Sequence, residues 1–578
     1  MRTWRSDWGS PVSRFGAAFD FLIMIRTRWD PSRERQLGRA RGQRLVVHAL
    51  LACSLGATGC DLIVNTKDTQ CDTDADCAAR GPQFAGTMCT SKKVCGREPC
   101  TTSHECVEIL GEPSYCRSDL TCTRLFTEDC KAVVPAKALD EDELILIGYM
   151  GPLVGENASY GLPTKEGAEL AIDEIEHSVH GLLPVDGGSQ RHLGMLVCDD
   201  DHDGQSGQRP AHHLVDDVQV PAIIGPAYSR ITVAVTTEVT IPANVLVMSA
   251  SATSPQISTL DDHDLVWRTV PSDAVQAEAL RWLLPNVEME HGLTSDSANV
   301  AMVVKKDSYG EGIQQRATKV YDQDGGVGTT SPAIKPTKVV AYDAPTSGRL
   351  TEQEANRVAG LVIGDAPDII FDFGTTEFVT DVLPKIEMSW PNAIYLVPEG
   401  GRVTELSDFV RTQKPTMSRR VLGTAPGARR SAGYREFEER FQGTFSHPPG
   451  NLAEFAYDAV YLIAYAIAIS HQPRPTGIEL AKAMRNVTPP CVDNPNPNPP
   501  KVPAGFEDIA RYFGIAANLG CIDFEGASGP LDFNANGEAD SDIATWCVSA
   551  SGDNPFPQLD TYYDAAIKQL VGNIFSCQ

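Results

Sequence analysis

Four short polar turns of this 578-residue chain carry the side chains best suited to binding a small charged ligand. Residues 225–229 (GPAYS) and 249–255 (SASATSP) place hydroxyl and backbone N–H groups ahead of predicted helices, an arrangement that holds a carboxylate. Residues 307–310 (DSYG) and 398–401 (PEGG) add a tyrosine and an acid. Each turn by itself is equally typical of an ordinary helix cap or loop. Together they predict a zwitterion receptor, with neutral donors for a carboxylate and the acid Glu399 for an ammonium.

Common signatures of catalysis are missing from the sequence. It contains no GxxxxGK[ST] phosphate loop, no HExxH zinc helix and no GxSxG nucleophile elbow. We therefore predict a protein that is not an enzyme.

Two clusters resemble metal sites, and for both we favour an ordinary loop. Residues 198–203 (CDDDHD) gather acids, a thiol and an imidazole, but neighbouring strand residues point to opposite faces, so few of them converge on one ion. Residues 532–540 begin like a calcium loop with Gly537 at its sixth position, yet Ile543 stands where a bidentate glutamate is required. A β-hairpin turn explains this second segment better. No metal and no cofactor is predicted.

The polar turns require strands and helices to position them. Ala168, Ala171, Ile172 and Ile175 form one helical stripe between two apolar runs. Apolar runs without strict alternation suit strands that are buried on both faces. Their alternation with helical segments predicts an α/β fold of parallel sheets with right-handed crossovers, divided into two lobes over residues 143–547. The runs lie at residues 144–148, 195–197, 222–224, 245–248, 300–304, 368–371 and 393–397.

Two further segments of this body have distinctive compositions. Residues 459–469 are apolar but too short to span a bilayer, so a buried core helix is favoured over a transmembrane helix. Residues 488–504 contain too many prolines for a helix or strand and predict an insertion loop. Residues 548–578 are left as a C-terminal tail.

The chain has 16 cysteines, which predict disulfides in an exported protein. Two copies of one spacing indicate two small stapled units within residues 60–130, with zinc as the alternative. Residues 131–142 are predicted as a linker. The copies comprise Cys71, Cys77, Cys89 and Cys95, then Cys100, Cys106, Cys116 and Cys122. We also expect pairing of Cys491 with Cys521, and of Cys547 with Cys577.

The first 59 residues have the features of an export signal. An arginine-rich stretch at 33–44 precedes an apolar run at 45–59, which ends in small residues before Cys60. This order resembles the lipobox of bacterial lipoproteins, which predicts lipidation of Cys60. An ordinary signal peptide is the alternative, and Met24 is an alternative start.

The formal net charge of −27 argues against nucleic acid as a partner, because phosphate binding needs a basic surface.

The ordered motifs of residues 143–547 resemble the type I periplasmic ligand-binding proteins, and most closely the branched-chain amino-acid receptors of ABC importers. Each motif is weak alone, whereas the ordered set is specific. The resemblance implies a two-lobed fold with three crossovers between the lobes. The motifs are residues 147–153 (IGYMGPL), 167–171 (GAELA), 224–226 (IGP), 251–255 (SATSP), 268–273 (RTVPSD), 309–312 (YGEG), 456–462 (AYDAVYL) and 524–537 (FEGASGPLDFNANG).

The resemblance also implies roles for individual residues. Ser229 and Thr253 match the positions that bind the ligand carboxylate, and the backbone carbonyl of Ser251 faces the ammonium. Tyr309 matches a tyrosine that closes over the ligand, and Glu399 matches the acid that pairs with the ammonium. Tyr160 matches an aromatic residue of the first lobe. One departure is residues 374–377 (GTTE), where these receptors often have a tyrosine, so a larger or more polar ligand side chain is permitted.

The resulting hypothesis is a monomeric, lipid-anchored periplasmic receptor. It would capture an amino acid or similar zwitterion by cleft closure and deliver it to the permease of an ABC importer. The alternative is a ligand sensor or surface-contact receptor with the same fold and no transport role.

Overall fold

A computed structural model describes residues 69–572, apart from 82–83, 85–86, 180, 186, 201–206, 295–296, 320–331, 428–430, 494–495, 497 and 506. The chain divides into two units, Met1–Thr69 and Gln70–Gln578. The predicted export signal, the predicted lipidation site Cys60 and the cysteine Cys577 lie outside the described residues. So does the later half of the acidic cluster at 198–203.

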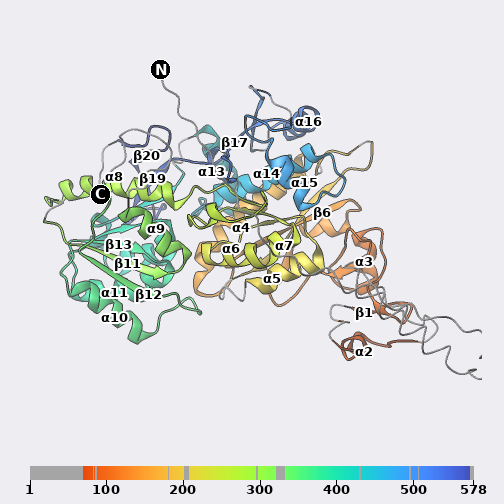
Figure 1. The fold of residues 1–578 in the computed structure, drawn as a ribbon, viewed down its shortest axis with the longest axis horizontal. Coiled ribbons are helices and arrows are strands. Elements are labelled where there is room, and N and C mark those ends of the chain that lie inside the picture. Colours follow the sequence, from red (N-terminus) through yellow and green to blue (C-terminus); the bar gives the residue numbers. More distant parts are fainter. Residues whose placement is uncertain are drawn as a thin grey trace, which may run out of the picture. The chain divides into compact units, whose positions relative to one another are not determined.

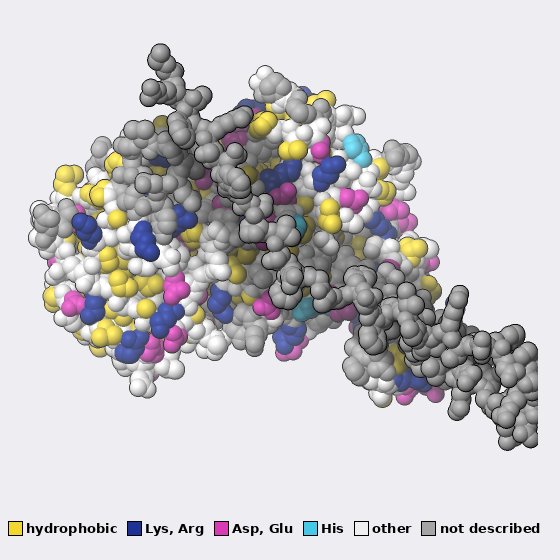
Figure 2. Space-filling model, viewed as in Figure 1, with side chains coloured by type: hydrophobic (Ala, Val, Ile, Leu, Met, Phe, Trp, Pro, Cys, Tyr) yellow, Lys and Arg dark blue, Asp and Glu magenta, His cyan; other side chains and the backbone are white. Residues whose placement is uncertain are grey.

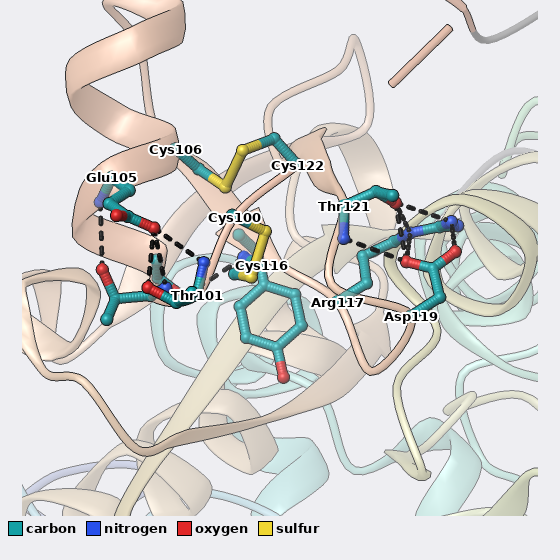
Figure 3. Close-up of a disulfide and its surroundings, with 12 residues drawn as sticks. Cys100, Thr101, Glu105, Cys106, Cys116, Arg117, Asp119, Thr121 and Cys122 are labelled. Carbon is teal, nitrogen blue, oxygen red and sulfur yellow. Dashed lines mark hydrogen bonds and ion pairs between the residues drawn. A yellow bond between two sulfur atoms is a disulfide. The ribbon is translucent and has the colours of Figure 1, made fainter. Parts of the chain in front are cut away.

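The cysteine-rich segment consists of two disulfide-stapled repeats, as predicted. In each repeat the first cysteine pairs with the third and the second with the fourth, which favours disulfides over zinc. Figure 3 shows the second repeat, where Glu105 at the start of helix α3 accepts hydrogen bonds from the backbone and hydroxyl of Thr101 at 2.7 and 2.9 Å. The pairs are Cys71–Cys89, Cys77–Cys95, Cys100–Cys116 and Cys106–Cys122. The elements are α2 (Asp74–Ala78), β1 (Met88–Cys89), β2 (Cys95–Gly96), α3 (Ser103–Leu110), β3 (Ser114–Cys116) and β4 (Cys122–Arg124).

The first lobe is built on a sheet of order β10-β9-β8-β6-β7-β5, in which all neighbours are parallel except β5 and β7. Its central strand β6 is buried throughout, as its unbroken apolar sequence predicts. The strands are β5 (Cys130–Val134), β6 (Leu144–Gly151), β7 (His192–Asp199), β8 (Ala222–Ile224), β9 (Leu246–Ser249) and β10 (Val266–Arg268). The helices are α4 (Ala158–Val179), α5 (Gln208–His212), α6 (Ser229–Val235) and α7 (Ile241–Ala243), with π-helical turns at His213–Val218 and Thr236–Thr240.

Residues 131–142 are not a linker. They form most of β5, which pairs antiparallel with β7 at the edge of the first-lobe sheet, and a 3₁₀ turn at Ala136–Asp140. A disulfide between Cys130 and Cys198 joins the two strands. The prediction was wrong because the mixed composition of this segment hides a short edge strand, in which only Cys130 and Val133 are buried.

The second lobe carries a sheet of order β12-β11-β13-β14-β15-β19-β20-β21. The pairings from β12 to β15 are parallel and those beyond β15 are antiparallel. The predicted C-terminal tail therefore continues this sheet as β20 and β21. The strands are β11 (Val300–Lys306), β12 (Lys338–Asp343), β13 (Ile369–Phe373), β14 (Ile394–Val397), β15 (Val421–Pro426), β19 (Ile543–Cys547), β20 (Gln558–Asp564) and β21 (Gln569–Val571). The helices, several of which flank the sheet in Figure 1, are α8 (Asp273–Glu290), α9 (Ser308–Thr318), α10 (Glu352–Ile363), α11 (Leu383–Ser389), α12 (Thr404–Thr412) and α13 (Ala432–Phe445).

Helix α14 (Ala453–Ser470) returns the chain to the first lobe and packs against α4. It is apolar and long enough to cross a membrane, but 89% of it is buried inside the protein, so it is the predicted core helix. Its Asp458 accepts hydrogen bonds from the backbone of Ala527 and Ser528 at 2.7 and 2.8 Å, and burial raises the pKa of this carboxyl to about 7. A side chain at Gly526 would collide with that carboxylate, which explains the glycine in this motif.

The proline-rich insertion is tied to the first-lobe side by the predicted disulfide Cys491–Cys521. Contrary to the prediction of an irregular loop, its last residues form β16 (Lys501–Pro503), which joins β17 (Asp523–Gly526) and β18 (Gly529–Pro530) in a small sheet. The remaining helices are α15 (Gly477–Met484) and α16 (Ile509–Leu519).

The calcium-like segment is a turn closed by antiparallel pairing of Phe533 with Ala539, with Gly537 at φ 69°.

Three crossings join the lobes within the described residues: β10 to α8, β15 to α13, and β18 to β19. Two of them are held together by Arg268, whose buried guanidinium lies 2.6 Å from Glu538. Thr269 donates to the carbonyl of Phe455 in α14 at 2.9 Å.

On the face shown in Figure 2, acidic and basic side chains are interspersed over the described residues.

Candidate functional site

The predicted binding residues meet in one small cavity between the lobes. Tyr160, Ser229, Ser251, Thr253 and Tyr309 all line it. Its other lining residues are Ala227, Tyr228, Asp307, Thr375 and Gly400. Glu399, the sixth predicted residue, is completely buried next to Gly400 and contacts Thr253. We refer to this space as the central cavity.

The first-lobe wall of the central cavity consists of two turns that hold each other. Ser229 begins helix α6, and its Oγ accepts the backbone N–H of Ser254 at 3.1 Å. Ser251 donates to the carbonyl of Ala227 at 3.1 Å. The hydroxyl of Tyr160 lies 3.5 Å from the carbonyl of Ser251, the group expected to face a ligand ammonium. These bonds fix the donors and acceptors of the wall before any ligand arrives.

Tyr160 and Tyr228 supply an aromatic surface on this same wall. Their rings are stacked, with centroids 5.0 Å apart and planes 7° from parallel. At residues 374–377, which contain no tyrosine, Thr375 lines the cavity. Tyr309 is the aromatic lining residue of the second lobe.

The second-lobe wall places Tyr309 and Glu399 at the ends of β11 and β14. Asp307 caps helix α9 by accepting the N–H groups of Tyr309 and Gly310 at 3.1 and 2.9 Å. The Tyr309 hydroxyl accepts the N–H of Gly400 at 3.3 Å. A Cβ at Gly400 would lie 2.7 Å from that hydroxyl, so only glycine allows this close approach.

Thr253 connects the walls through two buried acids. Its hydroxyl lies 3.0 Å from Asp273 Oδ2 and 3.3 Å from Glu399 Oε1. Burial raises the pKa of Glu399 to about 7. Burial, and then the negative charge of Glu399, raise the pKa of Asp273 well above its usual range. One oxygen of each carboxyl, Asp273 Oδ1 and Glu399 Oε2, has no hydrogen-bond partner among the described residues. The pair is therefore suited to a cationic donor.

Sequence reasoning gave no role to Asp273 or to Lys305. Asp273 ends the motif at 268–273, which served only to support the resemblance. Lys305 is the second-last residue of β11, is 8% exposed, and lies 3.4 Å from Glu377 Oε1. Its charge is visible in the sequence two residues before Asp307, but its burial is not.

Polar contacts between the lobes surround the central cavity. Ser254 donates to the carbonyl of Ser308 at 2.7 Å, Ser159 lies 2.9 Å from a carboxylate oxygen of Glu405, and Arg349 lies 3.1 Å from Glu156. In the described arrangement the two lobes are therefore in contact around the central cavity.

A larger hollow lies near the crossings and is lined by several acids, including Glu454, Asp532 and Asp540. It contains none of the six predicted binding residues. Residues 428–430 lie between two of its lining residues, Gly427 and Ser431, and are outside the described part of the chain. We assign no site to this hollow.

A model of the receptor family ligand binding region matches residues 164–548. The chain belongs to this family. Among its relatives is the Leu/Ile/Val-binding protein BraC3 of Rhizobium johnstonii, which is 30% identical over 193 residues, or 33% of this chain and 48% of the relative. The leucine-, isoleucine-, valine-, threonine- and alanine-binding protein of Pseudomonas aeruginosa is 23% identical over 344 residues, or 59% of this chain and 82% of the relative.

Two solved structures share the fold of this chain. The leucine binding protein LivK of Thermotoga maritima superimposes with a TM-score of 0.53 at 16% identity, covering 72% of this chain and 97% of that one. The substrate binding protein LivJ of Streptococcus pneumoniae, in complex with isoleucine, gives a TM-score of 0.52 at 17% identity, covering 72% and 99%. The type I periplasmic binding fold that the sequence motifs imply is confirmed.

Proposed function

We propose that this chain is an extracytoplasmic solute-binding protein that captures an amino acid or similar small zwitterion by cleft closure for an ABC importer. The observation that carries the proposal is the position of the Thr253 hydroxyl between two buried carboxyls, Asp273 and Glu399. Hydroxyls of the first lobe line the central cavity, and the two buried acids of the second lobe lie directly behind Thr253. No catalytic step is part of the proposal.

The ligand's two charges would be bound by different walls. Its carboxylate would accept the Ser229 and Thr253 hydroxyls on the first lobe. Its ammonium would face the Ser251 carbonyl and the acids of the second lobe, under Tyr309 and against Tyr160. Leaving one member of a buried charge pair without its partner costs about 2–5 kcal/mol. Closure over an ionised Glu399 therefore depends on a bound ammonium.

Thermal shift and calorimetry against the proteinogenic amino acids test this function. A ligand at about 100 times its dissociation constant should stabilise the protein by about 2.7 kcal/mol. The best ligand is then compared with its 2-hydroxy acid and with its decarboxylated amine, and both should bind much more weakly. A 2-hydroxy acid that binds as tightly as the amino acid would contradict the zwitterion site.

The anchor and the transporter are the finer parts of the proposal. We propose that Cys60 is lipidated and holds the protein at a bacterial membrane on its periplasmic side, where a monomer meets an ABC permease. Cys60→Ser should move the protein from the membrane fraction to the soluble periplasmic fraction and abolish labelling with a fatty acid. Cys53→Ser is the matched control and should change neither.

A sensing or surface-contact role is the second candidate, because the cysteine-rich segment is fixed to the first lobe. Tyr115 and Leu125 belong to the same buried cluster as strand β6, and Arg97 lies 3.2 Å from Asp217. This segment would present a rigid surface to a partner. Deleting the gene should abolish uptake of the identified ligand if the protein serves an importer. Unchanged uptake would favour the second candidate.

A further inference from the structure

A buried ammonium group lies beside the central cavity. Lys305 Nζ donates to Thr375 Oγ1 at 2.8 Å, and it lies 3.4 Å from Glu377 and 3.7 Å from Asp307. It also lies 5.6 Å from the ring centre of Tyr228, on the lining of the central cavity. A lysine is rarely buried without partners, so the groups around it determine what this place can bind.

The two acids next to Lys305 are already satisfied by the protein. Glu377 accepts the Tyr342 hydroxyl at 2.7 Å and also the backbone and hydroxyl of Thr375. Burial acts to raise its pKa, but the Lys305 charge and these hydrogen bonds outweigh burial, so the pKa lies below its ordinary value. Asp307 caps helix α9. Neither acid needs a cation from a ligand.

A second small cavity, the side cavity, adjoins the central cavity and shares Tyr228 and Asp307 with it. The first lobe contributes Arg230 and its neighbours to the lining, and the second lobe contributes Lys305 and Glu377. The full lining is Asn157, Tyr228, Arg230, Ile231, Lys305, Asp307, Pro345, Gly348 and Glu377. A ligand side chain that leaves the central cavity past Tyr228 would enter this space.

Arg230 is a charged lining residue of the side cavity whose guanidinium is not engaged by other described residues. It is partly buried, and its guanidinium has no ion pair or hydrogen bond among the described residues. A guanidinium matches a carboxylate through two parallel hydrogen bonds, which makes arginine a preferred partner for that group. The space thus combines an unpaired guanidinium with the Lys305 ammonium, while its acids are occupied.

We infer that the side cavity receives the distal carboxylate of an acidic α-amino acid, held by Arg230 and Lys305. The inference rests on the proposed function, because the α-amino and α-carboxylate groups would occupy the central cavity. An aliphatic side chain would desolvate both cations without replacing their water, and a cationic one would be repelled by them. The inferred ligand therefore differs from the branched aliphatic amino acids in the names of the relatives.

Calorimetry with glutamate, glutamine, leucine and lysine on the whole protein tests the inference. Glutamate should bind at least about tenfold more tightly than glutamine, since hydrogen bonds between charged groups are the stronger ones. Arg230→Gln should remove most of that preference while leaving glutamine affinity nearly unchanged. Arg511→Gln, at an exposed arginine of α16, is the matched control and should alter neither affinity.

A second variant covers the buried cation. Lys305→Met should weaken glutamate more than glutamine, and a circular dichroism melt shows whether the variant is folded. Tighter binding of leucine, glutamine or lysine than of glutamate would overturn the inference and leave the proposed function standing. Retained glutamate preference in Arg230→Gln would also overturn it. Failure of every α-amino acid to bind would instead overturn the proposed function.

Discussion

The two walls of the central cavity differ in the kind of group that they offer. The first-lobe wall is neutral, and its turns are tied together by bonds such as that from the Ser254 N–H to Ser229 Oγ. The second-lobe wall is backed by ionisable groups, among them Glu399 and Asp273, which contact Thr253 and whose pKa values are raised by burial. A neutral wall keeps its shape and charge at any pH, whereas the acidic wall changes with protonation and with the ligand. We therefore call the first-lobe wall the docking wall. We call the second-lobe wall the responding wall, because its protonation changes with pH and with the ligand.

The largest expected effect comes from removing the charge of the responding wall. Glu399→Gln should weaken amino-acid binding by about 2–5 kcal/mol, because the ammonium loses its buried partner. The fold should persist, since an amide fills the same space. Isothermal titration calorimetry measures the loss. The exposed Glu436→Gln in α13 is the matched control, and equal affinities for the two variants would show that the two walls do not differ as described.

Removing one hydroxyl from the docking wall should have a smaller effect. Thr253→Val deletes a donor to the ligand carboxylate and should cost about 1.5–3 kcal/mol of binding, as expected for a hydrogen bond to a charged group. Thr240→Val is a matched control, because the buried Thr240 hydroxyl lies in another part of the first lobe and has no hydrogen-bond partner among the described residues. Equal binding by both variants would remove Thr253 from the docking wall.

The pH dependence of affinity separates the walls in another way. Because burial raises the pKa of Glu399 to about 7, this carboxyl is largely protonated below that pH. The ammonium pairs with the ionised form, so binding releases a proton. Affinity should therefore fall by up to about tenfold for each pH unit below about 7.

Calorimetry in buffers of different ionisation enthalpy detects that released proton. The Glu399→Gln variant should lose most of the pH dependence, and Thr253→Val should keep it. An affinity of the unmodified protein that stays constant from about pH 5 to pH 8 would contradict a responding acidic wall.

The smallest effect is expected at the rim of the cleft. Arg349 and Glu156 meet across the lobes at 3.1 Å, but both side chains are about half exposed. An exposed ion pair contributes about 0.2–1 kcal/mol, so Glu156→Gln should weaken binding by no more than about fivefold. Raising the salt concentration should reduce that difference further. A loss of binding free energy as large as that of Glu399→Gln would show that the ion pair at the rim contributes as much to closure as the buried acid does.

The sequence also predicted the site residues of the two lobes unequally, because both of the residues that it missed belong to the second lobe. The six predicted residues gather in one place because each follows or precedes a strand whose carboxyl end faces the cleft, which apolar runs and polar turns reveal. Lys305 and Asp273 were missed because burial of a charged residue depends on neighbours such as Thr375 and Thr253, which are distant in the chain. The sequence shows the motifs that contain Lys305 and Asp273, but not the side chains that surround these two residues in the fold.

The cysteines show the same limit. The two local repeats and the Cys491–Cys521 pair were predicted because their cysteines lie close together in the chain, whereas the spacing left the connectivity within each repeat open. The Cys130–Cys198 pair was not, because it needs β5 to lie at the edge of the sheet beside β7. Antiparallel pairing of an edge strand leaves no local signal in a segment of mixed composition.

A crystal structure with a bound amino acid tests the central claim most directly. We expect its carboxylate against Ser229 and Thr253, and its ammonium within hydrogen-bonding distance of Glu399 and Asp273. A ligand whose ammonium lies away from both acids, with Glu399 turned toward bulk solvent, would contradict the account.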